Sequence, residues 1–209
     1  MNIIESLHWR YATKKFDNKK ILSQEKIDIL TEAFNLTATS YGLQPLKLVV
    51  IKNKSLQKEL TPHSWNQQQV ADASHVLVFC IENVVGEQYI SKHFDNVKAI
   101  RNTSEEILKP FKEQLVDSFT YKSPEEIFNW SAKQAYLALG NLLTVCAIEK
   151  IDSCPMEGFI PEKYDEILNL KDLGLKSVLV LPIGYRAEDD MFAEFKKVRR
   201  PITDTVITI

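Results

Sequence analysis

Glycine is scarce in this sequence, with 6 residues in 209, or about 3% where about 7% is typical. A dinucleotide-binding fingerprint needs three glycines within six residues, and a Walker loop also needs a pair, because only glycine lets backbone N–H groups wrap a phosphate closely. The glycines here stand singly, at Gly42, Gly86, Gly140, Gly158, Gly174 and Gly184. Both nucleotide loops are therefore excluded, and any bound phosphate must be held largely by side chains.

Cysteine and histidine are also few. The three cysteines, Cys80, Cys146 and Cys154, form no C-x-x-C pair and are too few for a disulfide framework, which predicts core thiols in a reducing, cytoplasmic setting. The four histidines show no H-E-x-x-H or other tight ligand spacing, so we expect no metal.

Excess charge and long apolar runs are absent as well. The 26 basic and 28 acidic residues nearly cancel, which argues against nucleic acid as a partner because such binding needs a sustained basic face. No signal peptide opens the chain, and apolar runs such as 76–81 are too short to span a membrane. No repeat, low-complexity segment or Gly/Ser linker interrupts the sequence, which predicts one domain over residues 1–209, compact alone or completed by dimerisation.

Hydrophobic patterning predicts both strands and helices. Nearly continuous apolar runs at 46–51, 76–81 and 175–183 indicate strands covered on both faces. Helices are expected from residue 3 behind an Asn2 cap, at 24–36 behind Ser23, and over about 25 residues from Pro124 behind a Ser123–Glu126 capping box. Short helices are expected at 55–60 and 67–73, and a helical surface excursion at about 88–115.

The β-branched tail, Pro201–Ile209, is poorly suited to remaining loose in water. We expect it to add as a strand to a sheet edge, either its own or a partner's.

Cationic residues gather at both ends of the chain. Arg10, Lys14 and Lys15 follow the first helix, and a second group, Lys196, Lys197, Arg199 and Arg200, precedes the tail. If the fold joins the two groups, they make a phosphate pocket, with arginine as a bidentate donor and lysine as a point charge. The alternative is two solvated charge runs, partnered by nearby acids at Glu188, Asp189, Asp190 and Glu194.

Two polar turns could also face a ligand. Thr37–Pro45 is a hydroxyl-rich loop in which Gly42 permits a positive backbone torsion, and Pro155–Phe159 is a tight turn around Gly158. Each turn can also be a simple connection between two elements that binds no ligand.

Six short strings in this order resemble the FMN-dependent nitroreductase family, nearest to its oxygen-insensitive NAD(P)H nitroreductase and dihydropteridine reductase branch. The strings are Arg10–Asp17, Thr39–Ser40 with Gln44–Pro45, Asn66 ahead of Asp72–His75, Lys133–Tyr136 with Gly140–Asn141, Pro155–Phe159, and Lys197–Arg199. Each string is weak alone, but together they cover nearly the whole chain.

The resemblance implies an α+β fold with a central, mostly antiparallel sheet flanked by helices, in an intertwined homodimer with FMN at the interface. It implies a ping-pong reaction in which NADH or NADPH reduces flavin N5, and a nitroaromatic, quinone or similar acceptor is then reduced. No side-chain nucleophile or acid/base pair is required, which agrees with the absence of any triad-like signature, and the redox step belongs to the cofactor.

The resemblance also assigns residues by position. Arg10, Lys197 and Arg199 would hold the FMN phosphate, Lys14 and Asn66 would contact the isoalloxazine edge, and the backbone of Glu157 and Gly158 would lie near N5. Lys14 would stabilise the negative charge of the reduced flavin and raise its potential. Thr39, Ser40 and Gly42 would come from the partner subunit.

Three cofactor-site positions depart from the branch's pattern. Tyr11 and Ala12 replace a histidine and a serine, so a hydroxyl contact to the cofactor is expected to be lost. Gln69 replaces a second lysine, which removes a positive charge and leaves the redox potential and the nicotinamide preference open.

Aromatic residues offer candidate substrate contacts. Phe119 and Tyr121 could stack on an aromatic substrate or pack under the long helix. Trp65 and Trp130 are expected to be core or interface residues instead.

Two other functions remain open alongside the NAD(P)H oxidoreductase. One is a flavin or dihydropteridine reductase, and the other is a non-catalytic flavin-binding dimer, for which the loss of a lysine at Gln69 is the only support.

Overall fold

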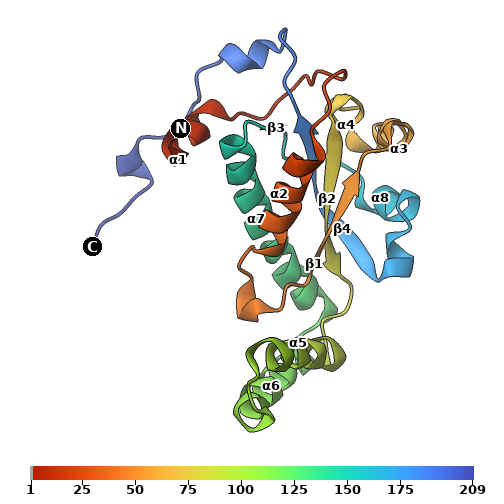
Figure 1. Cartoon of the computed structure of the whole chain (residues 1–209), viewed down its shortest axis with the longest axis vertical. Helices are drawn as coiled ribbons and strands as arrows, with labels where there is room; N and C mark the ends of the chain where they lie inside the picture. The colour runs from red at the N-terminus through yellow and green to blue at the C-terminus, as the bar shows by residue number, and fades with distance from the viewer. Residues whose placement is uncertain (1) are drawn as a thin grey trace.

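The sheet at the centre of the molecule is antiparallel throughout. The computed structural model describes residues 2–209, and their four strands are β1 (Leu46–Ile51), β2 (His75–Glu82), β3 (Asp152–Ser153) and β4 (Leu175–Gly184). Their order is β1-β2-β4-β3, and every neighbouring pair is antiparallel. Helices flank both faces (Figure 1), so the predicted α+β class with a mostly antiparallel sheet is confirmed.

The central strand β2 is buried from His75 to Ile81, as its continuous apolar run predicts. Successive side chains of a strand point to opposite faces. Leu77, Phe79 and Ile81 accordingly enter the core beneath α2 (Gln24–Asn35) and α7 (Pro124–Ile148). Val76, Val78 and Cys80 enter a second core beneath α3 (Lys54–Leu60), α4 (Gln69–Asp72) and α8 (Pro161–Ile167).

The predicted helix starts are confirmed. Asn2 and Glu5 form a capping box on α1 (Ile3–Trp9), and Ser23 accepts a hydrogen bond from the Lys26 backbone at the start of α2. Ser123 and Glu126 form a second capping box on the 25-residue α7. One face of α7 is buried on the sheet, while Tyr136 and Leu137 are about half exposed.

The polar stretch after β2 forms two helices, α5 (Glu87–Arg101) and α6 (Glu105–Thr120), which confirms the predicted helical excursion. They pack on each other around a small core of their own. In Figure 1 the pair projects beyond one end of the sheet.

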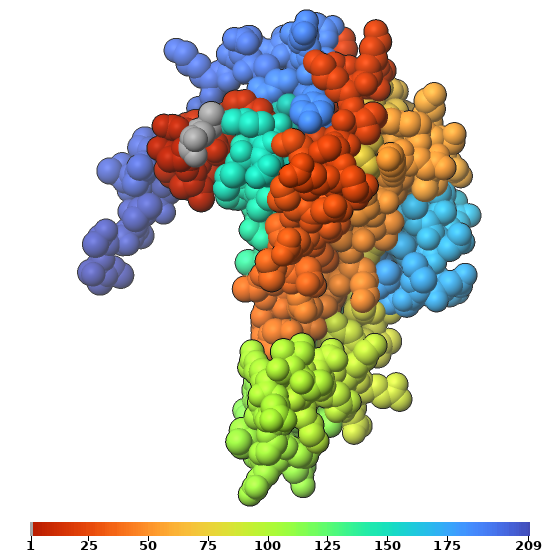
Figure 2. Space-filling model, in the orientation of Figure 1, coloured from red at the N-terminus to blue at the C-terminus, as the bar shows by residue number. Residues whose placement is uncertain are grey.

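The tail differs from its expected conformation. Residues 201–209 form a single 3₁₀ turn, Ile202–Asp204, and are exposed throughout. The prediction that the tail adds to its own sheet is therefore wrong, because the segment leaves the body of the molecule as an arm (Figure 2) and lies away from the strands of the sheet (Figure 1). Pairing with a partner's sheet stays a prediction.

Within residues 2–209, no helix combines the length and apolar character needed to cross a membrane.

Candidate functional site

The two cationic groups converge in the fold. Arg10 and Lys14 lie between α1 and α2, Lys197 and Arg199 follow β4, and all four line one cavity of about 380 Å³. The Lys197 ammonium donates a hydrogen bond to the Arg10 carbonyl, which joins the segments directly. Tyr11 and Ala12 line the same cavity.

The cations of this cavity lack counterions. Among the described residues, no carboxylate forms an ion pair with Arg10, Lys14, Lys197 or Arg199. The buried Arg10 Nε also has no hydrogen-bond partner there. Burial lowers the pKa of Arg10, and the charge of Arg199 lowers it further. The pKa of Lys197 is lowered by burial and by both arginines.

Buried donors without acceptors are costly, and so are like charges held together in a partly desolvated place. An anion in the cavity would relieve both costs. Lys15 shows the contrasting case of a solvated surface charge, because its exposed ammonium pairs with Asp189. The residues of the cavity therefore fit a phosphate group.

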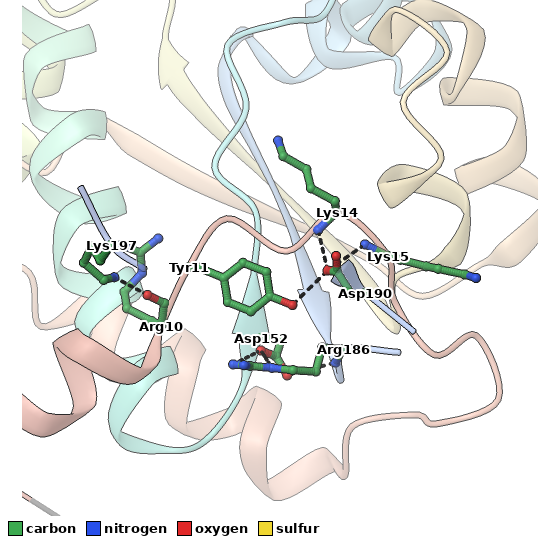
Figure 3. A network of polar contacts seen from close by, with 8 residues as sticks. All are labelled: Arg10, Tyr11, Lys14, Lys15, Asp152, Arg186, Asp190 and Lys197. Atoms are coloured by element: carbon green, nitrogen blue, oxygen red, sulfur yellow. Dashed lines mark hydrogen bonds and ion pairs between the residues drawn. The ribbon is translucent and has the colours of Figure 1, made fainter. Parts of the chain in front are cut away.

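A buried carboxylate lies beside the cavity (Figure 3). Asp190, 4% exposed, accepts hydrogen bonds at Oδ2 from the Tyr11 hydroxyl at 2.8 Å and from the Lys14 and Lys15 backbone N–H groups at 2.9 and 3.1 Å. Its Oδ1 accepts the Phe192 N–H at 3.2 Å. These hydrogen bonds lower the pKa of Asp190 although burial opposes the shift, so the carboxylate stays ionised.

A second charged pair supports the same segment. Arg186 Nε donates to Asp152 Oδ1 at 2.7 Å, and its guanidinium lies 4.3 Å from the Trp9 ring centre and 4.6 Å from that of Tyr11. Arg186 is thus neutralised and held between rings, unlike the cations of the cavity.

The segment after β3 connects the remaining predicted residues. Ala12 forms a β-bridge with Ser153, and Thr13 donates its backbone N–H to the Ser153 carbonyl at 3.2 Å. Burial raises the pKa of the Cys154 thiol, and the nearby Gln69 side chain, which the resemblance places near the flavin and which is 8% exposed, opposes this shift. Cys154 in turn lies within electrostatic range of Arg10 and Lys14.

The Pro155–Phe159 turn contacts the loop that carries Asn66. Gln67 Nε2 donates to the Gly158 carbonyl at 3.1 Å, and a Cβ on Gly158 would lie 2.8 Å from Trp65 Cε3. Only glycine allows this approach without displacing the indole ring. Trp65 and Asn66 both have left-handed backbone torsions, with φ of 54° and 57°, and both residues are exposed.

The hydroxyl-rich loop is held elsewhere in the chain. Gln134 of α7 accepts the Ser40 N–H at 2.8 Å, and Asn141 donates to the Thr37 hydroxyl at 2.9 Å. Thr39 lines a different cavity, beside α5, and Gly42 adopts φ +69°. One chain alone does not bring Thr39, Ser40 and Gly42 to the cationic cavity.

The aromatic candidates divide. Phe119 is 3% exposed and packs edge-on against Trp130 at 5.0 Å, so its ring is enclosed in the core of the excursion, and it offers no free face for stacking in this chain. Tyr121 is 80% exposed. Trp65 is 69% exposed, so a place in the core of the chain is wrong for it. It lies instead against the Pro155–Phe159 turn, at Gly158.

The sequence does not reveal the buried carboxylates of Asp190 and Asp152, or the partly buried Arg186 that pairs with Asp152. The run Glu188, Asp189, Asp190 indicates surface acids, and no pattern separates its buried member from the exposed neighbours.

Fold and site together define a class: an α+β protein with an antiparallel sheet whose anion cavity is built from side chains at both ends of the chain. Comparison with known proteins identifies the family within this class. The model of the nitroreductase family matches residues 7–185, and the chain belongs to that family. It is therefore an oxidoreductase.

Similar proteins agree with this assignment. A Staphylococcus aureus protein whose name calls it an NAD(P)H nitroreductase is 38% identical over 197 residues, covering 90% of this chain and 87% of its own. A Bacillus subtilis structure named for nitroreductase ydfN superposes with a TM-score of 0.88 at 18% identity, over 99% of this chain and 98% of its own. A nitroreductase structure from Exiguobacterium sibiricum, in complex with FMN, gives 0.84 at 18% identity, over 100% and 98%.

Proposed function

We propose that this chain is an FMN-dependent NAD(P)H oxidoreductase that works as a homodimer, with residues 1–209 forming one domain. Bound FMN would supply the redox chemistry at N5, taking a hydride from NADH or NADPH and passing it to a nitroaromatic, quinone or similar acceptor in a ping-pong cycle. The observation that carries the proposal is the set of unpaired cations around one cavity, together with the unpartnered buried Arg10 Nε.

The chain's own residues have distinct tasks in this proposal. Arg10, Lys197 and Arg199 bind the phosphate, and the arginines favour bidentate contact with its oxygens. Lys14 lines the same cavity and supplies positive charge where reduction adds negative charge to the pyrimidine edge of the cofactor. Asn66 and the Glu157–Gly158 backbone form the opposite end of the site.

The departures from the branch's pattern have structural counterparts. Tyr11 directs its hydroxyl to Asp190, and Ala12 has no side-chain donor, so neither adds a hydroxyl contact to the phosphate. Gln69 lies beside Cys154 and carries no charge, so position 69 supplies no second positive charge in addition to that of Lys14. We expect a lower flavin potential than a lysine at position 69 would produce.

Exposed apolar surface supports the homodimer. α7 leaves Phe128, Tyr136 and Leu137 partly exposed, and α1 does the same with Ile3 and Ile4. The two helices are in contact, and exposed apolar side chains on adjoining helices are typical of an association surface. A second copy on this face would also be the source of Thr39, Ser40 and Gly42 for the flavin, and of a sheet edge for the tail.

The described cysteines are free and buried, which supports a reducing compartment, and we propose the cytoplasm.

Anaerobic titration tests the activity. Protein reconstituted with FMN should lose its flavin absorbance when NADH or NADPH is added, and should regain it when a quinone or nitroaromatic follows. Failure to bleach with either nicotinamide, although FMN is bound, would support the non-catalytic dimer. Reoxidation by free flavin or a quinonoid dihydropteridine alone would support the alternative reductase.

A further inference from the structure

The two walls of the proposed phosphate cavity repel each other. Its two walls come from segments at opposite ends of the chain, and both walls carry positive charge. Like charges in a partly buried place repel each other, so contacts between the two walls are needed to hold the segments together.

Few contacts bind the walls. Residues 15–17 pair with residues 185–187 through Ala187 N to the Lys15 carbonyl at 2.9 Å and Asp17 N to the Tyr185 carbonyl at 2.8 Å. Beyond that point, the polar contacts between the walls among the described residues are the hydrogen bonds of Asp190, the Lys197–Arg10 contact and the solvent-exposed Lys15–Asp189 ion pair.

Asp190 joins the walls without occupying the anion's place. Its carboxylate oxygens accept from Tyr11, Lys14 and Lys15 on one wall and from Phe192 on its own. The Lys14 contact uses the backbone N–H, and its ammonium points away from the carboxylate (Figure 3). The charged ends of Arg10, Lys14, Lys197 and Arg199 thus remain available to a ligand.

We propose that Asp190 is a positioning residue for the phosphate end of the flavin site, with the Tyr11 hydroxyl as its partner on the other wall. The inference rests on the proposed function. It assigns Asp190 an effect opposite to that of its charge: as a bare negative charge it would weaken phosphate binding, whereas as a latch it strengthens binding by holding the cations in place.

The test compares FMN with riboflavin, which lacks the phosphate. Affinities of the apoprotein for both flavins are measured by fluorescence titration in the wild type, Asp190→Asn, Asp190→Ala and Asp189→Asn, with circular dichroism melts of each. Asp189 is the matched control, because it is the adjacent acid and its exposed carboxylate pairs with Lys15 alone.

We expect Asp190→Ala to lower FMN affinity about tenfold or more and to leave riboflavin affinity unchanged, since charge-assisted hydrogen bonds are strong and directional. Asp190→Asn should lower FMN affinity less, because an amide keeps an acceptor but opposes the Phe192 N–H. Asp189→Asn should leave FMN affinity unchanged or slightly raised.

Several outcomes would overturn the proposal. An FMN affinity that rises or stays constant in Asp190→Asn and Asp190→Ala means that the carboxylate acts only as a charge or not at all. A parallel loss for FMN and riboflavin means that it only stabilises the fold. Should Asp190→Ala not fold, Tyr11→Phe decides, with an expected FMN-selective loss of about threefold. A wild type that binds neither flavin refutes the proposed function itself, which separates that failure from failure of the latch.

Discussion

Two adjacent arginines provide a matched test of the phosphate assignment at the scale of single residues. Arg199 lines the cavity, whereas Arg200 does not. Arg199→Ala should lower FMN affinity about tenfold or more, because one charge-assisted contact is lost, at about 1.5–3 kcal/mol. Arg200→Ala removes the same charge and should change it little.

Fluorescence titration of both variants at two salt concentrations checks this prediction. A general charge effect would lower the FMN affinity of both variants by the same factor, and this loss would become smaller at the higher salt concentration. Equal affinities for the two variants would remove Arg199 from the site.

Individual residues also show what a sequence can and cannot predict about a site. The sequence leaves two interpretations of Arg10 and Arg199 open, a joined phosphate pocket or two solvated charge runs beside Glu188–Glu194, and the structure brings both arginines to one cavity. Asp190 was not predictable, because its role depends on donors from residues 11–15, about 175 positions away in the chain. Phe119 stays open from sequence for a related reason: an aromatic residue on an amphipathic helix has the same pattern whether it faces a ligand or packs under α7, as it does here.

Among the structural elements, α7 is the main support of the segments around the site. It packs on α1, α2 and the sheet, and its Gln134 and Asn141 hold the loop of residues 37–42. Its start depends on the capping box, in which Ser123 Oγ accepts the Glu126 N–H at 3.2 Å and Glu126 accepts the Ser123 N–H at 2.8 Å.

Ser123→Ala should therefore lower the free energy of unfolding by about 1 kcal/mol, a usual cost for losing an N-cap side chain. Ser104→Ala is the matched control, because Ser104 stands at the N-cap of α6 with the same extended backbone but makes no capping hydrogen bond. Urea unfolding compares the two variants. A Ser104 variant as unstable as the Ser123 variant would show that the capping contact contributes nothing.

Elements were more predictable than the site because their signals are local. Apolar runs, Ser caps and Pro124 each act within a few residues, and β1, β2, β4, α2 and α7 lie where those signals place them. The tail was the exception. Its β-branched residues favour a strand, but a strand needs an edge to pair with, and within residues 2–209 none lies beside the arm.

At the scale of the whole molecule, the arm and the partly exposed face of α7 are the features that support the proposed homodimer. Ile202, Val206 and Ile207 of the arm are each more than half exposed, which is unfavourable for a chain alone in water. Dimerisation would bury them and would bring the residue 39–42 loop of one subunit to the cavity of the other.

Deletion of residues 202–209 should therefore weaken the dimer by at least tenfold in its dissociation constant, as measured by analytical ultracentrifugation. The control replaces Ile100 and Ile107, two strongly exposed isoleucines of the excursion, with serine. That variant loses apolar surface elsewhere and should dimerise as the wild type does. An unchanged dimer after the deletion would mean that the arm does not join the partner.

The most direct measurement of the central claim is the ratio of FMN to riboflavin affinity in the wild-type protein. If Arg10, Lys197 and Arg199 hold the cofactor's phosphate, FMN binds at least tenfold more tightly than riboflavin, and the preference shrinks as salt concentration rises. Equal affinities for the two flavins at low salt concentration would contradict the account.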